Sequence, residues 1–144
     1  MSLVTRNAPK LTLAGARAVL AAAERRAAEI NMPMDIAVVD DGGHLLAFAR
    51  MDGAKLSSVD IAIAKAHCGA IRRKPTGPVR DGEQINLIVS LGLAIGSRGR
   101  QIPLRGGLPL EVDGICVGAI GVSNGSGDQD VDVAQAGAQA LVGA

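Results

Sequence analysis

Two short turns, each flanked by β-forming residues, place the strongest constraint on the fold of this sequence. The first lies in "MDIAVVDDGGHLLAFARM", where residues 40–43 (DDGG) separate two apolar runs. The second lies in "LPLEVDGICVGAIGVS", where residues 113–114 (DG) do the same. Glycine readily adopts the positive φ angles that tight hairpin turns require. The pattern therefore predicts two antiparallel hairpins.

Helical patterns lie before and between the two hairpins. Residues 13–30 are rich in strong helix formers, carry apolar residues at helical spacing and follow Thr12, a favoured N-cap residue. A second helix is expected from Ser57, with Asp60 in place of glutamate in a capping box. It should run to about Arg73, because basic residues suit the C-terminal end of a helix dipole.

The rest of the chain is predicted from its turn and cap residues. Residues 77–107 are glycine-rich around an apolar centre, Ile85 to Ile95. We expect a short helix or irregular segment there, then a loop and a strand near residues 101–104 (QIPL). After the second hairpin, Ser126 or Asp128 is expected to cap a final helix.

This order of elements predicts an α+β fold, and 144 residues suit a single domain over residues 1–144. A net charge of +1 and a single aromatic residue, Phe48, argue against a nucleic-acid partner. The sequence lacks a long apolar run, so no membrane partner is predicted, and "MSLVTRNAPK" lacks a signal-peptide core, so the cytoplasm is the expected location. Abundant alanine and glycine leave apolar surface that a small monomer covers poorly, which favours a homo-oligomer.

The cysteines and histidines do not predict a metal site. Cys68 and Cys116 are too few for a disulfide framework, and we expect free thiols. His67 and Cys68 are helix neighbours, which point about 100° apart and cannot form a shared dyad, and a zinc ion would need further ligands. The chain holds only one further residue of each type, so no zinc site is predicted.

Several strings, in this order, resemble one known family. They are "LTLAGARAVLAAAERRAAEI", "IAVVDDGGHLLAFARMDGA", "SVDIAIAKA", "RKPTG", "GGLPLEVDGICVGAIGVSNG" and "DQDVDVAQAGAQAL", over about residues 11–142. The family includes GlcG, HbpS and the C-terminal domain of PduO, and is often described as haem-degrading or haem-binding. The resemblance implies a profilin-like fold, with a five-stranded antiparallel sheet and helices on both faces, and homo-oligomers. It implies haem as a possible cofactor, and its members are also associated with redox sensing, cobalamin-related enzymes and catabolic operons.

The sequence departs from the family pattern beside the expected pocket. In "AIRRKPTG", Ile71 stands where an aromatic residue is expected, and Lys74 stands where arginine is expected. The resemblance therefore supports the fold more strongly than it supports any one ligand.

Two strings are candidates for binding a small anionic ligand. Arg73 and Thr76, in "RRKPTG", offer a bidentate guanidinium and a hydroxyl, although cations at a helix C-terminus need no ligand. Arg105, Gly106 and Gly107, in "LRGGLP", add a charge and backbone N–H groups that an anion can approach closely. The family resemblance implies that the two strings lie near one another, either within one chain or across a subunit boundary.

Lys65 and His67 are the candidate catalytic or haem-ligating residues. His67 is a candidate axial haem ligand, since imidazole commonly ligates haem iron. Alternatively, Lys65 or His67 serves as the general base of a cofactor-independent enzyme, such as a tautomerase, hydrolase or deaminase acting on a small carboxylated metabolite. A purely structural or regulatory oligomer without a small ligand is the third interpretation.

Overall fold

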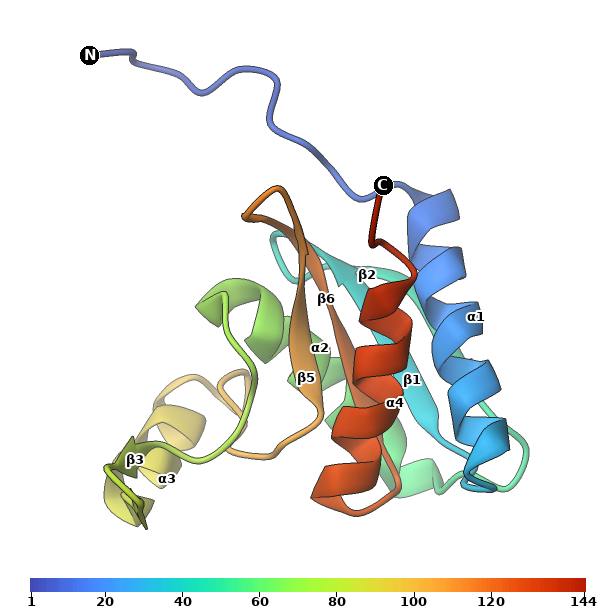
Figure 1. The fold of residues 1–144 in the computed structure, drawn as a ribbon. Helices are drawn as coiled ribbons and strands as arrows, with labels where there is room; N and C mark the ends of the chain where they lie inside the picture. The colour runs from blue at the N-terminus through green and yellow to red at the C-terminus, as the bar shows by residue number, and fades with distance from the viewer.

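The sheet that organises the molecule is four-stranded and antiparallel. The computed structural model describes residues 1–144, and its main sheet has the strand order β2-β1-β6-β5 (Figure 1). Each predicted hairpin supplies two adjacent strands of this sheet, and β1 pairs with β6 to join the hairpins. The four strands are β1 (Asp35–Asp40), β2 (Leu45–Arg50), β5 (Gly107–Val112) and β6 (Ile115–Ser123).

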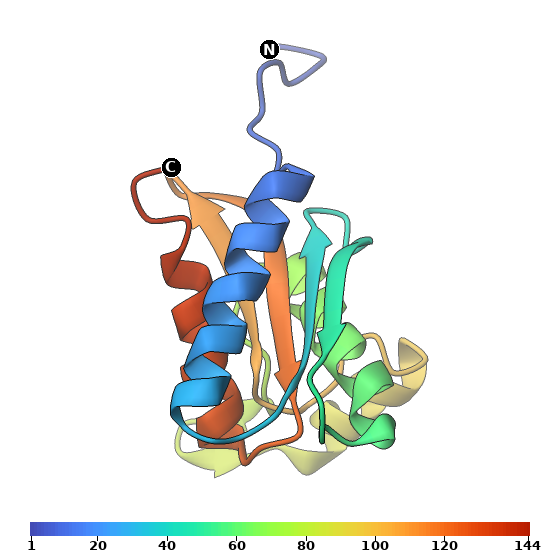
Figure 2. The ribbon, with the colours of Figure 1, turned by 90° about the vertical axis from the view of Figure 1, so that its right-hand side faces the viewer.

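Helices cover both faces of this sheet, as predicted. α1 (Leu13–Glu29) and α4 (Gly127–Gln139) pack on one face, while α2 (Val59–Arg72) packs on the other (Figure 2). The alternation of β1 divides its side chains between the two layers: Ile36 lies in the core under α1 and α4, and Ala37 lies in the core under α2. The fold is therefore α+β, with two apolar layers separated by one sheet.

Very small side chains bring α2 close to the sheet. Gly121 of β6 lies directly under α2, where an added Cβ would collide with the backbone of Ala62 and Ala66. The side chains between the two elements are mostly those of alanine. The position of α2 on the sheet is thus fixed by close backbone packing.

The predicted turns and two of the predicted caps are confirmed. Gly43 has a φ of 83° in the first turn, and Asp113 and Gly114 have φ values of 51° and 75° in the second. The Thr12 side chain accepts a hydrogen bond from the Gly15 N–H, 3.0 Å away, at the start of α1. Ser126 caps α4 in a reciprocal capping box with Gln129.

The start predicted for the second helix is wrong. Ser57 belongs to a short 3₁₀ turn, η1 (Leu56–Ser58), and α2 begins at Val59. The N-cap residue is Ser58, whose side chain makes no capping hydrogen bond. The 3₁₀ turn already tightens this end of the helix, so the capping box predicted for Ser57 and Asp60 does not form.

The predicted fifth strand is also wrong. Residues 101–104 form no strand, because the Leu104 carbonyl accepts a hydrogen bond from the Thr76 hydroxyl (2.6 Å) and Pro103 has no N–H to donate. The preceding residues instead form an arm outside the sheet, with a two-stranded sheet and a helix (Figure 1). Its elements are β3 (Arg80–Asp81), β4 (Gln84–Ile85) and α3 (Leu87–Gly96). The profilin-like assignment stays a prediction.

None of the helices is both long enough and apolar enough to cross a lipid bilayer.

Candidate functional site

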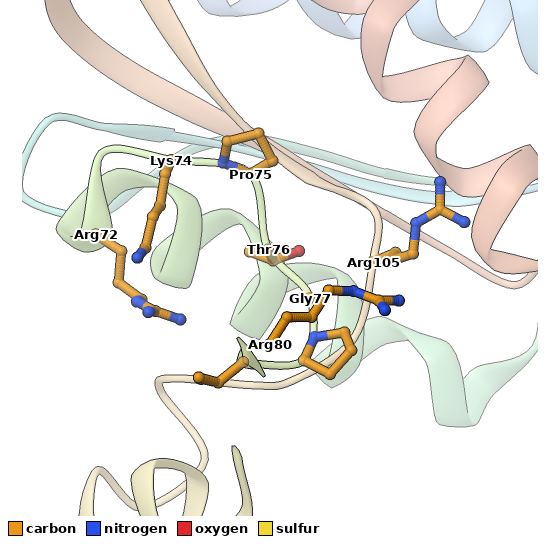
Figure 3. Close-up of a pocket in the computed structure, with 9 residues that line it drawn as sticks. Arg72, Lys74, Pro75, Thr76, Gly77, Arg80 and Arg105 are labelled. Atoms are coloured by element: carbon orange, nitrogen blue, oxygen red, sulfur yellow. The ribbon is translucent and has the colours of Figure 1, made fainter. Parts of the chain in front are cut away.

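A cationic hollow lies beyond the C-terminal end of α2. It has a volume of about 390 Å³, and four of its lining side chains are basic: Arg72, Lys74, Arg80 and Arg105 (Figure 3). None of the residues that line it is acidic. Arg105 pairs with Asp128 at 2.6 Å, and both side chains are exposed, so solvent screens this pair and the other three cations have no acidic partner among the lining residues. We refer to this space as the cationic hollow.

The two strings expected to lie together do so at one wall of this hollow. Thr76 and Gly107 exchange two hydrogen bonds: the Thr76 N–H donates to the Gly107 carbonyl at 2.9 Å, and the Gly107 N–H donates to the Thr76 hydroxyl at 2.8 Å. An added Cβ on Gly107 would collide with Lys65 and Thr76. The Thr76 hydroxyl is occupied by protein partners, so it holds the wall rather than reaching into the hollow.

Lys65 is buried in an ion pair behind that wall. Its Nζ donates to Asp130 Oδ2 and to the Val122 carbonyl, each at 2.8 Å, and both charged side chains are 4% exposed. The Gly125 N–H donates to the other oxygen of Asp130 at 2.9 Å. Burial raises the pKa of Asp130, against the opposing influence of Lys65. The pair joins α2, β6 and α4, and Lys65 keeps one ammonium hydrogen without a protein acceptor.

Gly106 lies against this ion pair. Its φ is 122°, and an added Cβ would lie 2.6 Å from the Val122 carbonyl and 3.0 Å from Lys65 Nζ. Lys65 and Asp130 also line a smaller hollow of about 230 Å³, which shares Arg105 with the cationic hollow. The structure thus brings together Lys65, Thr76, Arg105, Gly106 and Gly107.

His67 lies elsewhere, in a groove between α2, the first turn and the segment after α3. This histidine groove has a volume of about 470 Å³. The His67 Nδ1 lies 3.1 Å from the Gly43 carbonyl. A carbonyl only accepts hydrogen bonds, so Nδ1 carries a proton, and in the neutral imidazole Nε2 then keeps a free lone pair. An added Cβ on Gly43 would collide with the imidazole ring, so glycine permits this contact.

Two arginines and several aliphatic side chains accompany His67. A neighbouring hollow of about 540 Å³ shares His67, Arg98 and Arg100 with the histidine groove. Ile63 lines the first and Ile71 lines the second. His44 also lines the groove, although its side chain is 83% exposed. Neither Arg98 nor Arg100 was predicted as a site residue, and the string "SRGR" was the available signal in the sequence.

Arg73 is separated from both of these sites. It follows α2 in the left-handed conformation, with a φ of 55°, and lines a different hollow together with Asp41 and Glu111. Arg72, one residue earlier, lines the cationic hollow instead. The left-handed residue turns the chain sharply, which explains why neighbouring arginines face different surroundings.

The cysteines are free, as predicted. Cys68 is buried with its Sγ 3.9 Å from the Ile102 carbonyl, and Cys116 is partly buried. Burial raises the pKa of the Cys68 thiol, against the opposing influence of Arg72. A thiol in this state is a poor nucleophile. No group of three or more histidine, cysteine and acidic side chains is arranged so that it could hold a metal ion.

These observations define a small α+β domain whose charged hollows surround one sheet-covering helix. The chain belongs to the HbpS-like family: the family model described as "haem degrading protein HbpS-like" matches residues 11–139. The resemblance stated from the sequence is therefore confirmed.

Individual relatives agree with this assignment. An uncharacterized 15.0 kDa protein from the dhaT-dhaS intergenic region of Citrobacter freundii is 38% identical over 83% of this chain and 84% of its own length. Protein GlcG of Escherichia coli K12 is 37% identical over 75% of this chain and 77% of its own. The crystal structure of a PduOC–haem complex superposes with a TM-score of 0.80, at 29% identity, and covers 92% of this chain and 96% of that one.

Proposed function

We propose that this protein binds haem in the histidine groove, with His67 as the axial ligand. The observation that carries the proposal is the hydrogen bond between His67 Nδ1 and the Gly43 carbonyl. Metal-ligating histidines commonly donate their other ring N–H to a carbonyl or carboxylate, which fixes the tautomer and the ring orientation. His67 has this arrangement, with Nε2 left to bind iron.

The other residues of the histidine groove also fit haem. Haem needs apolar contacts for its macrocycle and cations for its propionates. Ile63 and Ile71 supply aliphatic surface, and Arg98 and Arg100 supply positive charge on the same two hollows. A volume of about 470 Å³ lies within the range of small-molecule sites, roughly 300–1,000 Å³. The haem complex of a relative and the family description support the same ligand.

When bound, haem would supply electron-transfer or oxygen chemistry at its iron. The chain's own contribution is orientation. Gly43 holds the imidazole ring of His67, and the two arginines provide the counter-charges for an anionic ligand.

A haemin titration tests the proposal. We expect a saturable shift of the Soret band in the wild-type protein, weakened by at least about tenfold in His67→Ala. His44→Ala is the matched control, because it removes the other imidazole of the same groove. Far-UV circular dichroism checks that each variant is folded. Absence of a saturable shift, or equal weakening in both variants, would contradict the proposal.

A second candidate function is cofactor-independent acid–base catalysis on a small carboxylated metabolite. The observation that favours it is that Lys65, a buried lysine, and Arg105 line the same 230 Å³ hollow. Lys65 would move the proton and Arg105 would hold the carboxylate. His67 would need to act separately, in its own groove. Proton NMR of a panel of keto and unsaturated carboxylates would reveal turnover, which Lys65→Met should abolish at a temperature where far-UV circular dichroism shows the variant folded.

We also propose that the protein is a homo-oligomer that associates through α3. Its residues 87–96 carry no charge, and Ser90 is the only buried one. Leu87, Ile88 and Ile95 are exposed by 62%, 84% and 78%. A second copy could cover this helix without opposing like charges. Light scattering should show a multimer in the wild-type protein and a smaller species in Ile88→Glu, while Val142→Glu, at another exposed apolar position, should keep the wild-type mass.

A further inference from the structure

We propose that the cationic hollow binds a small aliphatic molecule with several negatively charged oxygens, such as a di- or tricarboxylate or a phosphate ester. This site is separate from the histidine groove, because the residues that line the two have none in common. The inference therefore goes beyond the proposed haem site and does not depend on it.

Charge is the first argument. Arg72, Lys74 and Arg80 line the hollow with Arg105, and no acidic side chain lines it. Like charges held together around one space repel each other, so the arrangement favours a bound anion. The one acidic partner in contact, Asp128, meets Arg105 outside the lining and is 89% exposed. In Figure 3, Arg72 and Lys74 lie at one end of the view and Arg105 at the other, with the Arg105 guanidinium turned toward α4, where Asp128 lies.

The second argument is that the backbone around these cations is held in place. Thr76 is tied to Gly107 by the hydrogen bonds already described. The Val79 N–H donates to the Ser90 hydroxyl at 2.9 Å, and the Val79 carbonyl accepts from the Asn86 N–H at 2.8 Å. Proline on either side of Thr76 and Gly77 restricts the chain further. A preordered wall reduces the entropy cost of binding.

Orientation of Arg80 adds to this preordering. Its Nη1 donates to the Glu83 carbonyl at 3.0 Å across the β3–β4 turn, which fixes the guanidinium without neutralising its charge. A fixed, planar guanidinium binds carboxylate or phosphate through two parallel hydrogen bonds.

The lining also limits the kind of anion. Val79 is its one hydrophobic residue, and no aromatic side chain is present to stack on a nucleobase or another ring. A volume of about 390 Å³ accommodates a small molecule rather than a polymer. The chemistry therefore favours a compact, multiply charged aliphatic oxyanion, a class that carboxylates and phosphate esters share.

Isothermal titration calorimetry with citrate, pyrophosphate and acetate tests the inference. We expect saturable binding of citrate, pyrophosphate or both, with acetate at least about tenfold weaker, because a single charge meets fewer of the cations. Tighter citrate would assign the ligand to carboxylates, and tighter pyrophosphate would assign it to phosphates. Weak, unsaturable heats for citrate and pyrophosphate alike would overturn the proposal.

Variants locate the site. Arg72→Gln and Arg80→Gln should each weaken binding by about tenfold to a hundredfold, the usual loss for one charge-assisted hydrogen bond. Arg25→Gln, an equal change of charge at an exposed position of α1, should leave it unchanged. An equal loss of anion affinity in Arg25→Gln would indicate nonspecific electrostatic attraction and would contradict the proposed site.

A haemin titration of the same variants separates this inference from the proposed haem site. Both Arg72→Gln and Arg80→Gln should keep the wild-type Soret shift, whereas His67→Ala should keep citrate or pyrophosphate binding. If a single variant removed both ligands while remaining folded by circular dichroism, the claim of two separate sites would be wrong.

Discussion

The two faces of the sheet are packed in different ways. The face under α1 and α4 buries large aliphatic side chains, and the face under α2 buries small ones. The first group includes Met34, Ile36, Leu110, Ile120 and Val133. The second consists of Ala37, Val39, Ala62, Ala66, Ala70 and Ala119.

The two faces of the sheet therefore contribute differently to the stability of the fold and to the positioning of the candidate site residues. Large buried side chains remove more apolar area from water, so the α1 and α4 face contributes more hydrophobic stabilisation. The α2 face contributes less area but holds a helix at close backbone contact. The same helix carries Lys65 and His67 along its length and Arg72 at its end. The face that contributes less hydrophobic stabilisation therefore positions these three candidate site residues.

The largest expected effect comes from breaking the buried ion pair on the α2 face. Lys65→Met should lower the free energy of unfolding by about 3–5 kcal/mol, because it leaves Asp130 charged, buried and unpaired. Urea denaturation would measure this loss. Lys55→Met, at an exposed lysine, is the control and should change stability little.

The pH dependence of Lys65→Met sharpens the same test. Burial already raises the pKa of Asp130, and removing Lys65 removes the main opposing influence. An acid whose pKa is higher in the folded state than in the unfolded state gives stability that is lost as pH rises between the two values. The deficit should therefore be smaller in acid than at pH 7. Adding Asp130→Leu should restore part of the lost stability, and a deficit independent of pH would contradict the account.

Neighbouring residues of β1 compare the two faces directly. Ala37→Val adds carbon atoms beneath the closely packed α2 and should cost about 1–3 kcal/mol. Ile36→Val removes one methylene from the opposite core and should cost about 0.5–1.5 kcal/mol. Thermal unfolding of both variants shows which of the two substitutions costs more stability. If Ala37→Val cost less than Ile36→Val, the α2 face would be less tightly packed than the structure indicates.

Local signals in the sequence predicted most of the fold. The glycines of both turns, the Thr12 cap and the Ser126 capping box each act within a few residues, so the sequence displays them directly. The errors depend on distant partners. The segment of residues 101–104 is irregular because Thr76, far away in the chain, takes the carbonyl of Leu104.

The candidate site was predicted only in part for the same reason. Thr76 and Gly107 could be expected to meet, because the family resemblance fixes the order of the elements around them. The direction of each basic side chain could not be predicted. The left-handed conformation of Arg73 separates it from Arg72, so that only Arg72 lines the cationic hollow. Likewise, Arg98 and Arg100 reach the histidine groove only because the arm folds back toward α2.

The smallest expected effect is a gain of stability from Asp35, at the start of β1. Its carboxylate is fully buried, and neither oxygen has a hydrogen-bond partner in the protein. By strand alternation it lies on the same face as Ala37, the face of α2. Burial raises its pKa, against the opposing charge of Arg50. Asp35→Asn should therefore stabilise the protein at pH 7 by about 1 kcal/mol, because it removes the buried charge while keeping a polar side chain of the same shape.

The pH profile decides whether charge is the cause of that gain. Asp35 is protonated in the folded protein at pH values where it has already ionised in the unfolded chain, so its contribution falls as pH rises from about 3.8 to the higher folded value. Asp35→Asn removes this decline, and its advantage over the wild type should grow with pH across that window and stay constant above it. Asp52→Asn, at an exposed position, should show no such trend. An advantage that did not change with pH would mean that Asp35 is destabilising through its shape or its polarity, and that the α2 face accommodates charge as well as it accommodates alanine.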